Sequence, residues 1–391
     1  MPKLSEADIC AKLITPALNR ARWGEAEQIY REYTLRPGRV VVRGQKASRD
    51  KRSVLRADYV LFYKTSIPLA VIEAKDNTHA VGAGMAQAIT YAALLDVPFA
   101  FSSNGDGFVF RDATLASGAH YIDLSDGRDF VAGFGAAIDV AAKQANRLAV
   151  TGASTLPALS SAVIDNLAPQ FATIRSIDTI IAPAQSAARG TATLAGALSY
   201  AGKPFSGWEQ GTWRARHGWQ DVRRVDAGPV GKRLSAVCDV PDLVLFPVRY
   251  PGVEDVRFRA ALDVGVQHLA IALLAALRRA GLNISIDKLA PHLDRIATWF
   301  DRFGSDVGGM TVTLAGTASN GQPLRLRWHV RAPGRDGPEI PCMAAILLAR
   351  KLAAGTIGHV GAMPYVGLIP LFDFTPEFAK WGMTTAVEEL H

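Results

Sequence analysis

The stretch PLAVIEAK, residues 68–75, ends an apolar run with the charged pair Glu73 and Lys75. A short apolar run is typical of a buried β-strand, and residues two apart on a strand point to the same face. Upstream, ADYVLFYK at 57–64 predicts a second strand, with Asp58 near its start. If the two strands form a hairpin, Asp58 lies beside Glu73 and Lys75 at the edge of a buried sheet.

Two carboxylates and an ammonium group are the set that phosphodiester hydrolysis needs. Asp58 and Glu73 can bind Mg²⁺, which polarises a phosphate and lowers the pKa of a bound water. Lys75 can orient that water or neutralise charge in the transition state. A Glu and a Lys two apart are also common on solvated surfaces, so the pair alone predicts nothing. Its place at the end of an apolar run, with Asp58 upstream, favours a metal site.

The neighbouring sequence indicates an α/β arrangement around these strands. Ser5 and Asp8 form a helix N-cap box, after which apolar residues recur at helical spacing as far as Leu18. Further elements are then predicted from pattern and turn residues. They are a strand at 40–42, a helix at about 84–95, a strand at 99–102 and a turn at 104–105.

Two more features lie near the predicted site. Gln87 and Tyr91 are four apart on the predicted helix and share a face, although an ordinary amphipathic surface gives the same spacing. A basic run precedes Asp58, and such runs are usually solvated, but beside a metal site this one favours a clamp on the DNA backbone. The candidate backbone contacts are Arg39, Arg43, Lys46, Arg49, Lys51, Arg52 and Arg56. No base-reading motif is recognisable.

On these residues, the segment 1–112 resembles the N-terminal domain of the restriction (R, motor) subunit of type I restriction-modification enzymes. That domain belongs to the PD-(D/E)xK nuclease superfamily. The matching stretches are LSEADICAKLITPAL, GRVVVRGQKASR, RADYVLFYK, IPLAVIEAKDNTHAVGAGMAQAITYA and VPFAFSSNGDGFVF.

The resemblance implies a role for each matching position. Asp58, Glu73 and Lys75 would be the catalytic triad, and Gln87 and Tyr91 the supporting Q-x-x-x-Y motif. Glu6 would assist the metal site, and Ala57 stands where the family has Pro. The implied cofactor is Mg²⁺, and the implied partners are double-stranded DNA with methylase and specificity subunits. The family continues into an ATP-driven translocase, but this chain has no G-x-x-x-x-G-K-[ST] loop, so ATP binding is not expected.

From about residue 115 the composition changes, because Ala, Gly and Pro rise and basic residues no longer cluster. Strand-like stretches at 243–246 and 310–314 alternate with helical ones at 263–280 and 341–352. No internal repeat or low-complexity linker marks the change, so the boundary has no hinge sequence.

Residues 115–391 resemble a saccharopine dehydrogenase-like oxidoreductase. The matching stretches are GAHYIDLSDGRDFV, TGASTLPALSSAVID, CDVPDLVLFPVRY, FGSDVGGMTVTLAGTASNGQPL and PCMAAILLARKL. The family's strand–G-x-G-x-x-G–helix unit, which binds dinucleotide phosphates, is absent here. Asp123, Gly152 and Ser154 would lie near a nicotinamide pocket, although ordinary turns and caps use the same residue types. We expect no meaningful NAD(P) affinity, and a chain that fuses two partial families near residues 113–118.

Bulk composition narrows the classes further. A net charge of +7 and a pI near 9.4 weakly favour an acidic partner. Cys10, Cys238 and Cys342 are odd in number and far apart, which argues against a disulfide framework or zinc site and favours a reducing, cytoplasmic setting. The polar N-terminus predicts no signal peptide. The most apolar run, 269–277, is too short to span a bilayer and favours a buried helix over a helix at a membrane surface.

Three hypotheses remain. The preferred one is a magnesium-dependent DNA endonuclease of the type I restriction class, truncated without its translocase, because its site is complete. The alternative is an NAD(P)-linked saccharopine dehydrogenase-like oxidoreductase that lacks its cofactor half. The third is an inactive or assembly-only chain, in which a half-Rossmann sheet exposes a long unpaired edge. The expected architecture is an α/β nuclease fold with a mixed sheet flanked by helices, followed by an α+β domain.

Overall fold

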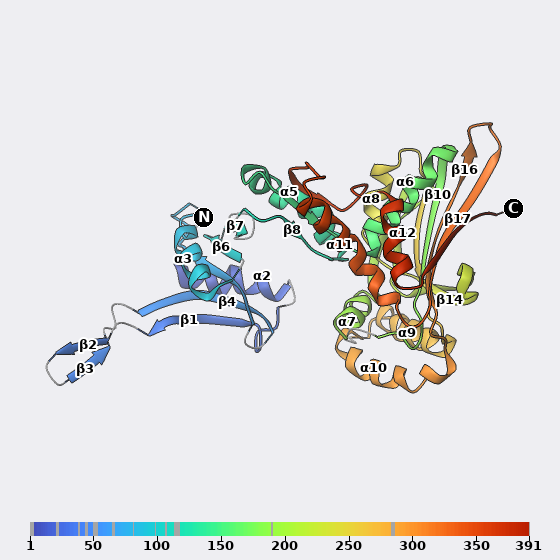
Figure 1. Ribbon diagram of the computed structural model, residues 1–391. Helices are drawn as coiled ribbons and strands as arrows, with labels where there is room; N and C mark the ends of the chain where they lie inside the picture. The colour runs from blue at the N-terminus through green and yellow to red at the C-terminus, as the bar shows by residue number, and fades with distance from the viewer. Residues whose placement is uncertain are drawn as a thin grey trace. The chain divides into compact units, whose positions relative to one another are not determined.

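The structure, a computed structural model, has two compact units. It describes residues 4–20, 23–37, 40–43, 46–49, 54–64, 67–80, 82–97, 99–105, 108–112, 118–188, 191–282 and 286–390. The first unit comprises Met1–Tyr121 and Ala141–Arg147, and the second comprises Ile122–Val140 and Leu148–His391 (Figure 1). The assignment of 1–112 to a nuclease domain and 115–391 to a dehydrogenase remnant stays a prediction.

Within the described residues, the first unit contains a five-stranded mixed sheet in the order β1-β4-β5-β6-β7. Its strands are β1 (Ile29–Pro37), β4 (Val54–Lys64), β5 (Ile67–Ala74), β6 (Phe99–Ser103) and β7 (Phe108–Asp112). β4 and β5 pair antiparallel, which confirms the predicted hairpin, and β5 pairs parallel with β6 through the crossover helix α3 (Met85–Leu95). A separate ribbon joins β2 (Val40–Arg43) to β3 (Lys46–Arg49) and confirms the predicted strand at 40–42.

Helices cover both faces of this sheet. α1 (Glu6–Ile9), the π-helical turn η1 (Cys10–Ile14) and α2 (Thr15–Arg20) follow one another directly, and Ser5 and Asp8 form the predicted capping box. One face of the sheet packs on this segment through Ile9, Ile14, Leu18, Tyr59, Leu61 and Ile72. The other packs on α3 through Val60, Val71, Ala88, Tyr91 and Ala92. Strand side chains alternate between the two apolar layers, so the sheet is buried from both sides.

Gly105 closes the turn after β6 and has φ +88, a conformation that favours glycine. A Cβ there would contact Leu13 and come within 2.6 Å of Ile9 Cδ1. Gly105→Ala should therefore destabilise the first unit by about 2 kcal/mol, from backbone strain plus overpacking. Gly118→Ala is the matched control, because its φ is +83 but its nearest neighbour, Arg147 Nη2, is 3.5 Å away. Hydrogen exchange of first-unit peptides measures both losses, and equal losses would argue against the packing contribution.

The second unit is built on a nine-stranded sheet, counted over the described residues. The path is β12-β11-β15-β10-β16-β17-β19, with β14 paired to β13 and β15. The strands are β10 (Phe171–Ala182), β11 (Pro204–Glu209), β12 (Thr212–His217), β13 (Gln220–Asp226), β14 (Lys232–Val237), β15 (Asp255–Ala260), β16 (Gly308–Ala318), β17 (Pro323–Ala332) and β19 (Thr384–Glu389). A smaller sheet has the order β18-β9-β8, from Gly361–Pro364, Leu148–Thr151 and Tyr121–Ile122.

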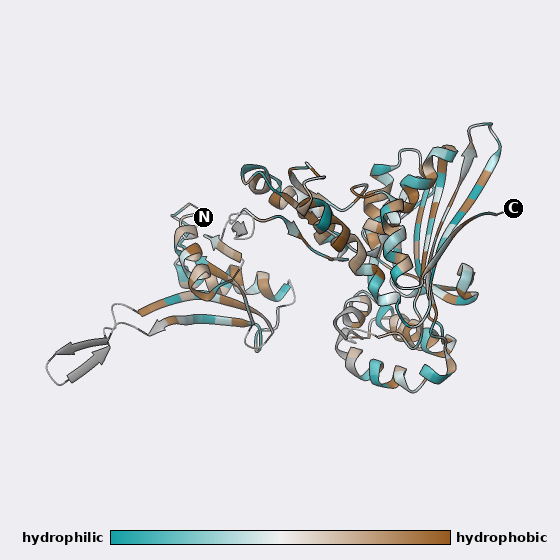
Figure 2. Cartoon of the chain, viewed as in Figure 1, coloured by the Kyte–Doolittle hydropathy of each residue, from teal (hydrophilic) through white to brown (hydrophobic). Residues whose placement is uncertain are grey.

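Helices pack on one face of the large sheet, among them α6 (Ser160–Leu167) and α8 (Asp242–Arg249), and the other face is polar. The other helices in this part of the chain are α5 (Arg128–Gln144), α7 (Thr191–Ser199), α9 (Gly265–Arg279), α10 (Ala290–Thr298), α11 (Ile340–Ala353) and α12 (Leu371–Lys380). α6 contacts β16 and α8 contacts β15. On β17, Leu326, Trp328 and Val330 enter the core, while the alternate residues are polar, and Figure 2 shows the same alternation along the neighbouring strands. The overall class is therefore mixed α/β.

Several predictions for the second unit can be compared with these elements. β16, α9 and α11 confirm the strand at 310–314 and the helices at 263–280 and 341–352. The strand predicted at 243–246 is wrong, because these residues lie in α8. The helix at 269–277 is only partly buried, because Leu269 and Leu273 are 52% and 61% exposed. The third hypothesis expected a sheet with a long unpaired edge. In the described residues the strands of the small sheet have only two to four residues, so the edge of this sheet is short. No described helix has the length and apolarity needed to span a membrane.

Candidate active site

The hairpin of the first unit brings together the three residues singled out in the sequence. Asp58 lies on β4, Glu73 is the last residue but one of β5, and Lys75 follows directly after β5. The Ala74 amide donates to Asp58 Oδ2 at 2.7 Å, and the Asp58 amide lies 3.4 Å from Glu73 Oε1. Lys75 Nζ is 4.0 Å from Glu73 Oε2. Two carboxylates and one ammonium group therefore share one end of the hairpin.

Burial makes this pair of carboxylates costly to ionise. The Glu73 side chain is 1% exposed, and burial, followed by the nearby Asp58 carboxylate, raises the pKa of Glu73 to about 8. Burial also raises the pKa of Asp58, against the opposing effect of its hydrogen bond from Ala74. Lys75 offsets only part of the repulsion in both cases. A cation bound between the two carboxylates would therefore offset the cost of ionising them.

Helix α3 begins against the same site. Its N-cap, Gly84, is buried, and a Cβ there would lie 3.1 Å from Glu73 Cβ. One turn further on, Gln87 Nε2 donates to Tyr91 Oη at 3.1 Å, which shows that the two residues share a face as predicted. From the other side of the sheet, Glu6 Oε1 on α1 reaches Lys75 Nζ at 3.4 Å. Glu6 therefore contacts the lysine rather than the two carboxylates.

The donor set of the candidate site consists of carboxylate oxygens, which suit the implied Mg²⁺. In the part of the chain that the structure describes, no group of three or more His, Cys, Asp or Glu side chains is arranged to hold a metal ion. Mg²⁺, however, prefers oxygen ligands, keeps several waters and is often bound by one or two carboxylates. The buried carboxylate of Glu73 and the neighbouring, half-buried carboxylate of Asp58 fit that requirement.

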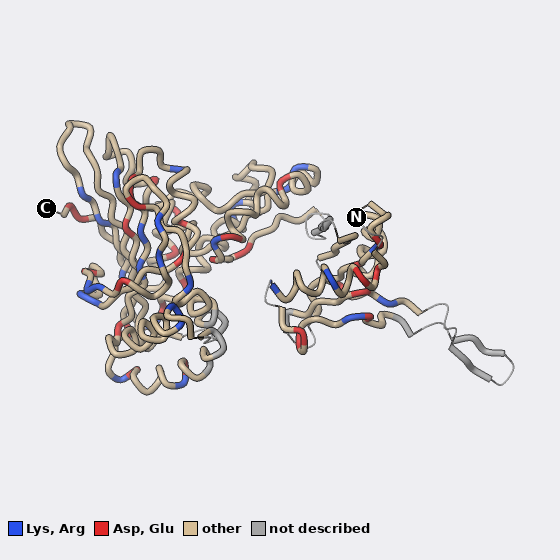
Figure 3. The backbone as a smooth tube through the Cα atoms, turned by 180° about the vertical axis from the view of Figure 1, so that it is seen from behind, with Lys and Arg blue, Asp and Glu red and all other residues tan. Residues whose placement is uncertain are grey.

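The basic clamp is only partly visible. Arg56 lies exposed on β4 and forms an ion pair with Glu32, with Nη1 and Oε2 3.3 Å apart. Arg43, Lys46 and Arg49 fall on β2 and β3, whose side chains lie outside the description. Arg39, Lys51 and Arg52 lie outside the described residues. Lys and Arg are marked in Figure 3 for the described part alone, and the clamp stays a prediction.

The residues expected near a nicotinamide pocket form a braced turn in the second unit. Asp123 Oδ1 accepts from Thr151 Oγ1 at 2.8 Å and from the Gly152 amide at 3.1 Å. Gly152 has φ +76, and the Ser154 amide donates to the Gly152 carbonyl at 2.7 Å. These bonds are sufficient to explain the residue types as turn residues. The nicotinamide pocket itself stays a prediction.

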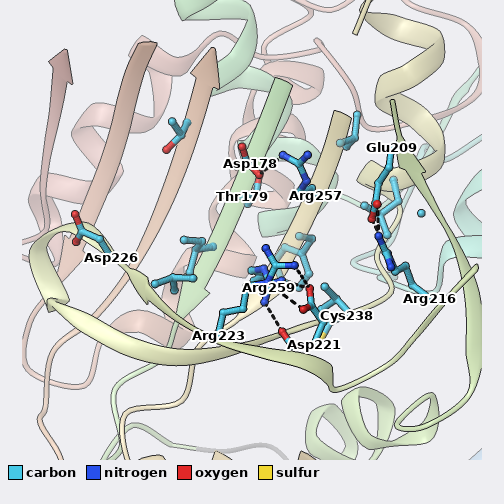
Figure 4. Close-up of a pocket in the computed structure, with 18 of the residues that line it drawn as sticks. Asp178, Thr179, Glu209, Arg216, Asp221, Arg223, Asp226, Cys238, Arg257 and Arg259 are labelled. Carbon is cyan, nitrogen blue, oxygen red and sulfur yellow. Dashed lines mark hydrogen bonds and ion pairs between the residues drawn. The ribbon is translucent and has the colours of Figure 1, made fainter. Parts of the chain in front are cut away.

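A cavity of about 560 Å³ lies on the polar face of the large sheet, roofed by β13 and β14 (Figure 4). None of the residues predicted for a site lines it. Arginines and carboxylates alternate across it. The pairs are Arg216–Glu209, Arg223–Asp221, Arg259–Asp221, Arg257–Asp178 and Arg327–Asp226. Most of its charge is thus used in ion pairs within the protein.

Two residues near the candidate active site were not singled out in the sequence, Gly84 and Ser102. The Gly84 amide donates to Ser102 Oγ at 3.0 Å. Ser102 lies on β6 opposite Glu73 on β5, and its side chain is fully buried. The available signal was the polar sequence Ser102–Asn104 directly after the apolar run Phe99–Phe101.

These geometries define a carboxylate–lysine site at the end of a buried hairpin. Known proteins are similar to parts of this chain. Over 118 residues, 30% of this chain, the sequence is 56% identical to the type I restriction enzyme EcoAI endonuclease subunit of Escherichia coli. The chain spans 14% of the length of that relative. No protein-family model matches the chain.

Two solved structures are also similar to parts of this chain. A fragment of a putative HsdR subunit of a type I restriction enzyme from Vibrio vulnificus YJ016 is 40% identical, covers 29% of this chain and 22% of that chain, and has a TM-score of 0.27. The apo saccharopine dehydrogenase (L-Glu forming) from Saccharomyces cerevisiae is 10% identical, covers 71% of this chain and 81% of that chain, and has a TM-score of 0.49. The type I restriction family named from the sequence therefore recurs in sequence, over less than a third of this chain.

Proposed function

We propose that the first unit is a magnesium-dependent DNA endonuclease module of the PD-(D/E)xK type and the type I restriction class. The observation that carries the proposal is the buried Glu73 carboxylate beside the half-buried Asp58, with Lys75 at the edge of the pair. The 56% identity to an endonuclease subunit supports it. The proposed substrate is double-stranded DNA, and the proposed partners are methylase and specificity subunits in the cytoplasm.

In this proposal Asp58 and Glu73 hold Mg²⁺, and Lys75 faces the reacting phosphate. When bound, the ion supplies a polarised phosphate and a water of lowered pKa. The Lys75 ammonium, 4.0 Å from Glu73 Oε2, can orient the attacking water and offset the charge that develops on the phosphate oxygens. Glu6 restrains the same ammonium group from α1. Gln87 and Tyr91 present a hydrogen-bonded polar pair on the helix that begins beside Glu73.

Lys75→Ala tests the assigned role of the ammonium group. The variant should cleave supercoiled plasmid DNA about 100-fold more slowly than the wild-type chain at saturating Mg²⁺, because a charged donor to the transition state is lost. Lys12→Ala is the matched control, since Lys12 is an exposed lysine of the same unit, paired with Asp8. It should cleave at the wild-type rate.

The wild-type measurement decides the function itself. Cleavage should require Mg²⁺ and stop when EDTA is added. A wild-type chain that cleaves no faster than Lys75→Ala would refute the nuclease activity, and a wild-type chain that cleaves equally well in EDTA would refute its metal dependence.

A further inference from the structure

Ser102 lies on β6, next to Glu73 on the neighbouring strand β5. β5 and β6 run parallel with Glu73 opposite Ser102, so their side chains leave the sheet on the same face, toward α3. The Ser102 side chain is fully buried, and Glu73 is 1% exposed. A hydroxyl group is thus placed beside the innermost carboxylate of the candidate site.

The Ser102 hydroxyl also holds the start of α3. Its oxygen accepts from the Gly84 amide at 3.0 Å, one of the amides that a helix N-terminus leaves without an internal partner. A Cβ on Gly84 would lie 3.0 Å from Ser102 Oγ and 3.1 Å from Glu73 Cβ. The backbone of the helix start is therefore in direct contact with both strands, and glycine is what allows this approach.

The chain between Lys75 and α3 gives the helix little other support at this end. Residues 78–80 and 82–83 are exposed, although Asn104 Nδ2 donates to the His79 carbonyl at 2.8 Å. An exposed loop cannot fix the register of the helix by packing. The hydrogen bond of Gly84 with Ser102 therefore ties the first turn of α3 to the strand beside Glu73, while Ala88 and Tyr91 pack the rest of the helix on the sheet.

We propose that Ser102 is a positioning residue of this site, which rests on the nuclease function proposed above. By fixing the Gly84 amide beside the Glu73 strand, the Ser102 hydroxyl holds Gln87 and Tyr91 at their working distance from the Asp58 and Glu73 carboxylates. Displacements of about 1 Å in a catalytic arrangement can lower a rate by about 100-fold, so a small shift of α3 is sufficient to matter.

The adjacent residue provides a matched control. Ser103 is also buried, and its Oγ accepts from a glycine amide, that of Gly105, at 3.1 Å. Successive strand residues point to opposite faces, so Ser103 faces away from α3. Ser102→Ala and Ser103→Ala remove the same atom from neighbouring buried positions and should destabilise the first unit similarly, by about 1 kcal/mol.

The experiment compares both variants as full-length chains. Single-turnover cleavage of plasmid DNA at saturating Mg²⁺ should slow about 10-fold in Ser102→Ala and less than about 2-fold in Ser103→Ala. Hydrogen exchange of the segment containing Gly84, measured without metal, should speed up more in Ser102→Ala than in Ser103→Ala, because only the first variant also frees the Gly84 amide. Ser102→Cys, which keeps a weak acceptor, should give intermediate values and serves if Ser102→Ala does not fold.

The outcomes separate the two proposals. If the wild-type chain does not cleave DNA, the nuclease function fails, while the exchange measurement still decides whether Ser102 anchors α3. If the wild-type chain cleaves and Ser102→Ala cleaves as fast as Ser103→Ala, Ser102 has no positioning role. Exchange at Gly84 that is no faster in Ser102→Ala than in Ser103→Ala overturns the anchoring on its own.

Discussion

Glu73→Gln is expected to stabilise the metal-free first unit at pH 8 and, in the same protein, to lower Mg²⁺-dependent cleavage by about 1000-fold. The two effects have one cause. Glu73 is buried beside Asp58, and two carboxylates so close together lower the free energy of unfolding when no cation is bound. Gln keeps the shape of the side chain and removes its charge.

The sign of the stability effect follows from the raised pKa. In the unfolded chain Glu73 titrates near 4.5, and in the fold its pKa is raised to about 8 by burial and by Asp58. The stability that comes from holding the proton is fully present below pH 4.5 and is lost as the pH rises to 8. The effective dielectric around buried groups in proteins is higher than that of a dry interior and reduces this cost, so we expect Glu73→Gln to be more stable by about 2 kcal/mol at pH 8 and under about 0.5 kcal/mol at pH 5.

Hydrogen exchange of β4 and β5 peptides at both pH values measures the stability, and plasmid cleavage measures the activity. Mg²⁺ should slow exchange in the wild-type chain but not in the variant, because only the wild-type chain binds it in the folded state. Glu25→Gln, an exposed carboxylate paired with Arg31, is the control and should change neither property. If the stability gain of Glu73→Gln over the wild-type chain is no larger at pH 8 than at pH 5, the pKa of Glu73 is not raised in the fold, and the buried position of this carboxylate beside Asp58 is refuted.

The parts of this site that the sequence predicts are those that depend on local pattern. Glu73 and Lys75 lie together because the strand period is two, and Pro68–Ile72 is apolar because β5 is buried on both faces. The helix with Gln87 and Tyr91 follows from its spacing. Asp58 needed one assumption, a hairpin, and the antiparallel pairing of β4 with β5 satisfies it.

The parts that the sequence did not predict depend on distant pairing. Ser102 reads as an ordinary strand serine until β6 is placed beside β5, because only the parallel register puts it opposite Glu73. The run Leu243–Phe246 is too short to distinguish a buried strand from a buried helix, and it forms α8 because Leu243 and Phe246, three apart, share the face that enters the core.

In the second unit, Asp221→Asn is expected to destabilise the fold by about 2 kcal/mol. Arg259 carries a side chain that is only 10% exposed, and it is bound by the Asp221 carboxylate and by the Asp221 carbonyl at 2.8 Å (Figure 4). Removal of the carboxylate charge leaves a largely buried guanidinium without its ion-pair partner. Asn is the appropriate substitution because residue 221 has φ +55, which Asn tolerates better than Ala. The expected loss lies between those of exposed and fully buried pairs, since Asp221 is 35% exposed.

A double-mutant cycle identifies the cause. The single variant Arg259→Met removes the buried charge and leaves Asp221 paired with Arg223 at 2.9 Å. Because no unpaired guanidinium then remains at position 259, the double variant Asp221→Asn/Arg259→Met should recover more than half of the loss. Asp255→Asn is the control, because it removes one of two ion pairs of Arg257, a residue that is 40% exposed and that retains Asp178. The loss of stability should stay at about 0.5 kcal/mol. Urea unfolding followed by tryptophan fluorescence reports on this unit, because every Trp except Trp23 belongs to it. If the double variant is as unstable as Asp221→Asn alone, the cost comes from the turn at residue 221 and not from the unpaired guanidinium.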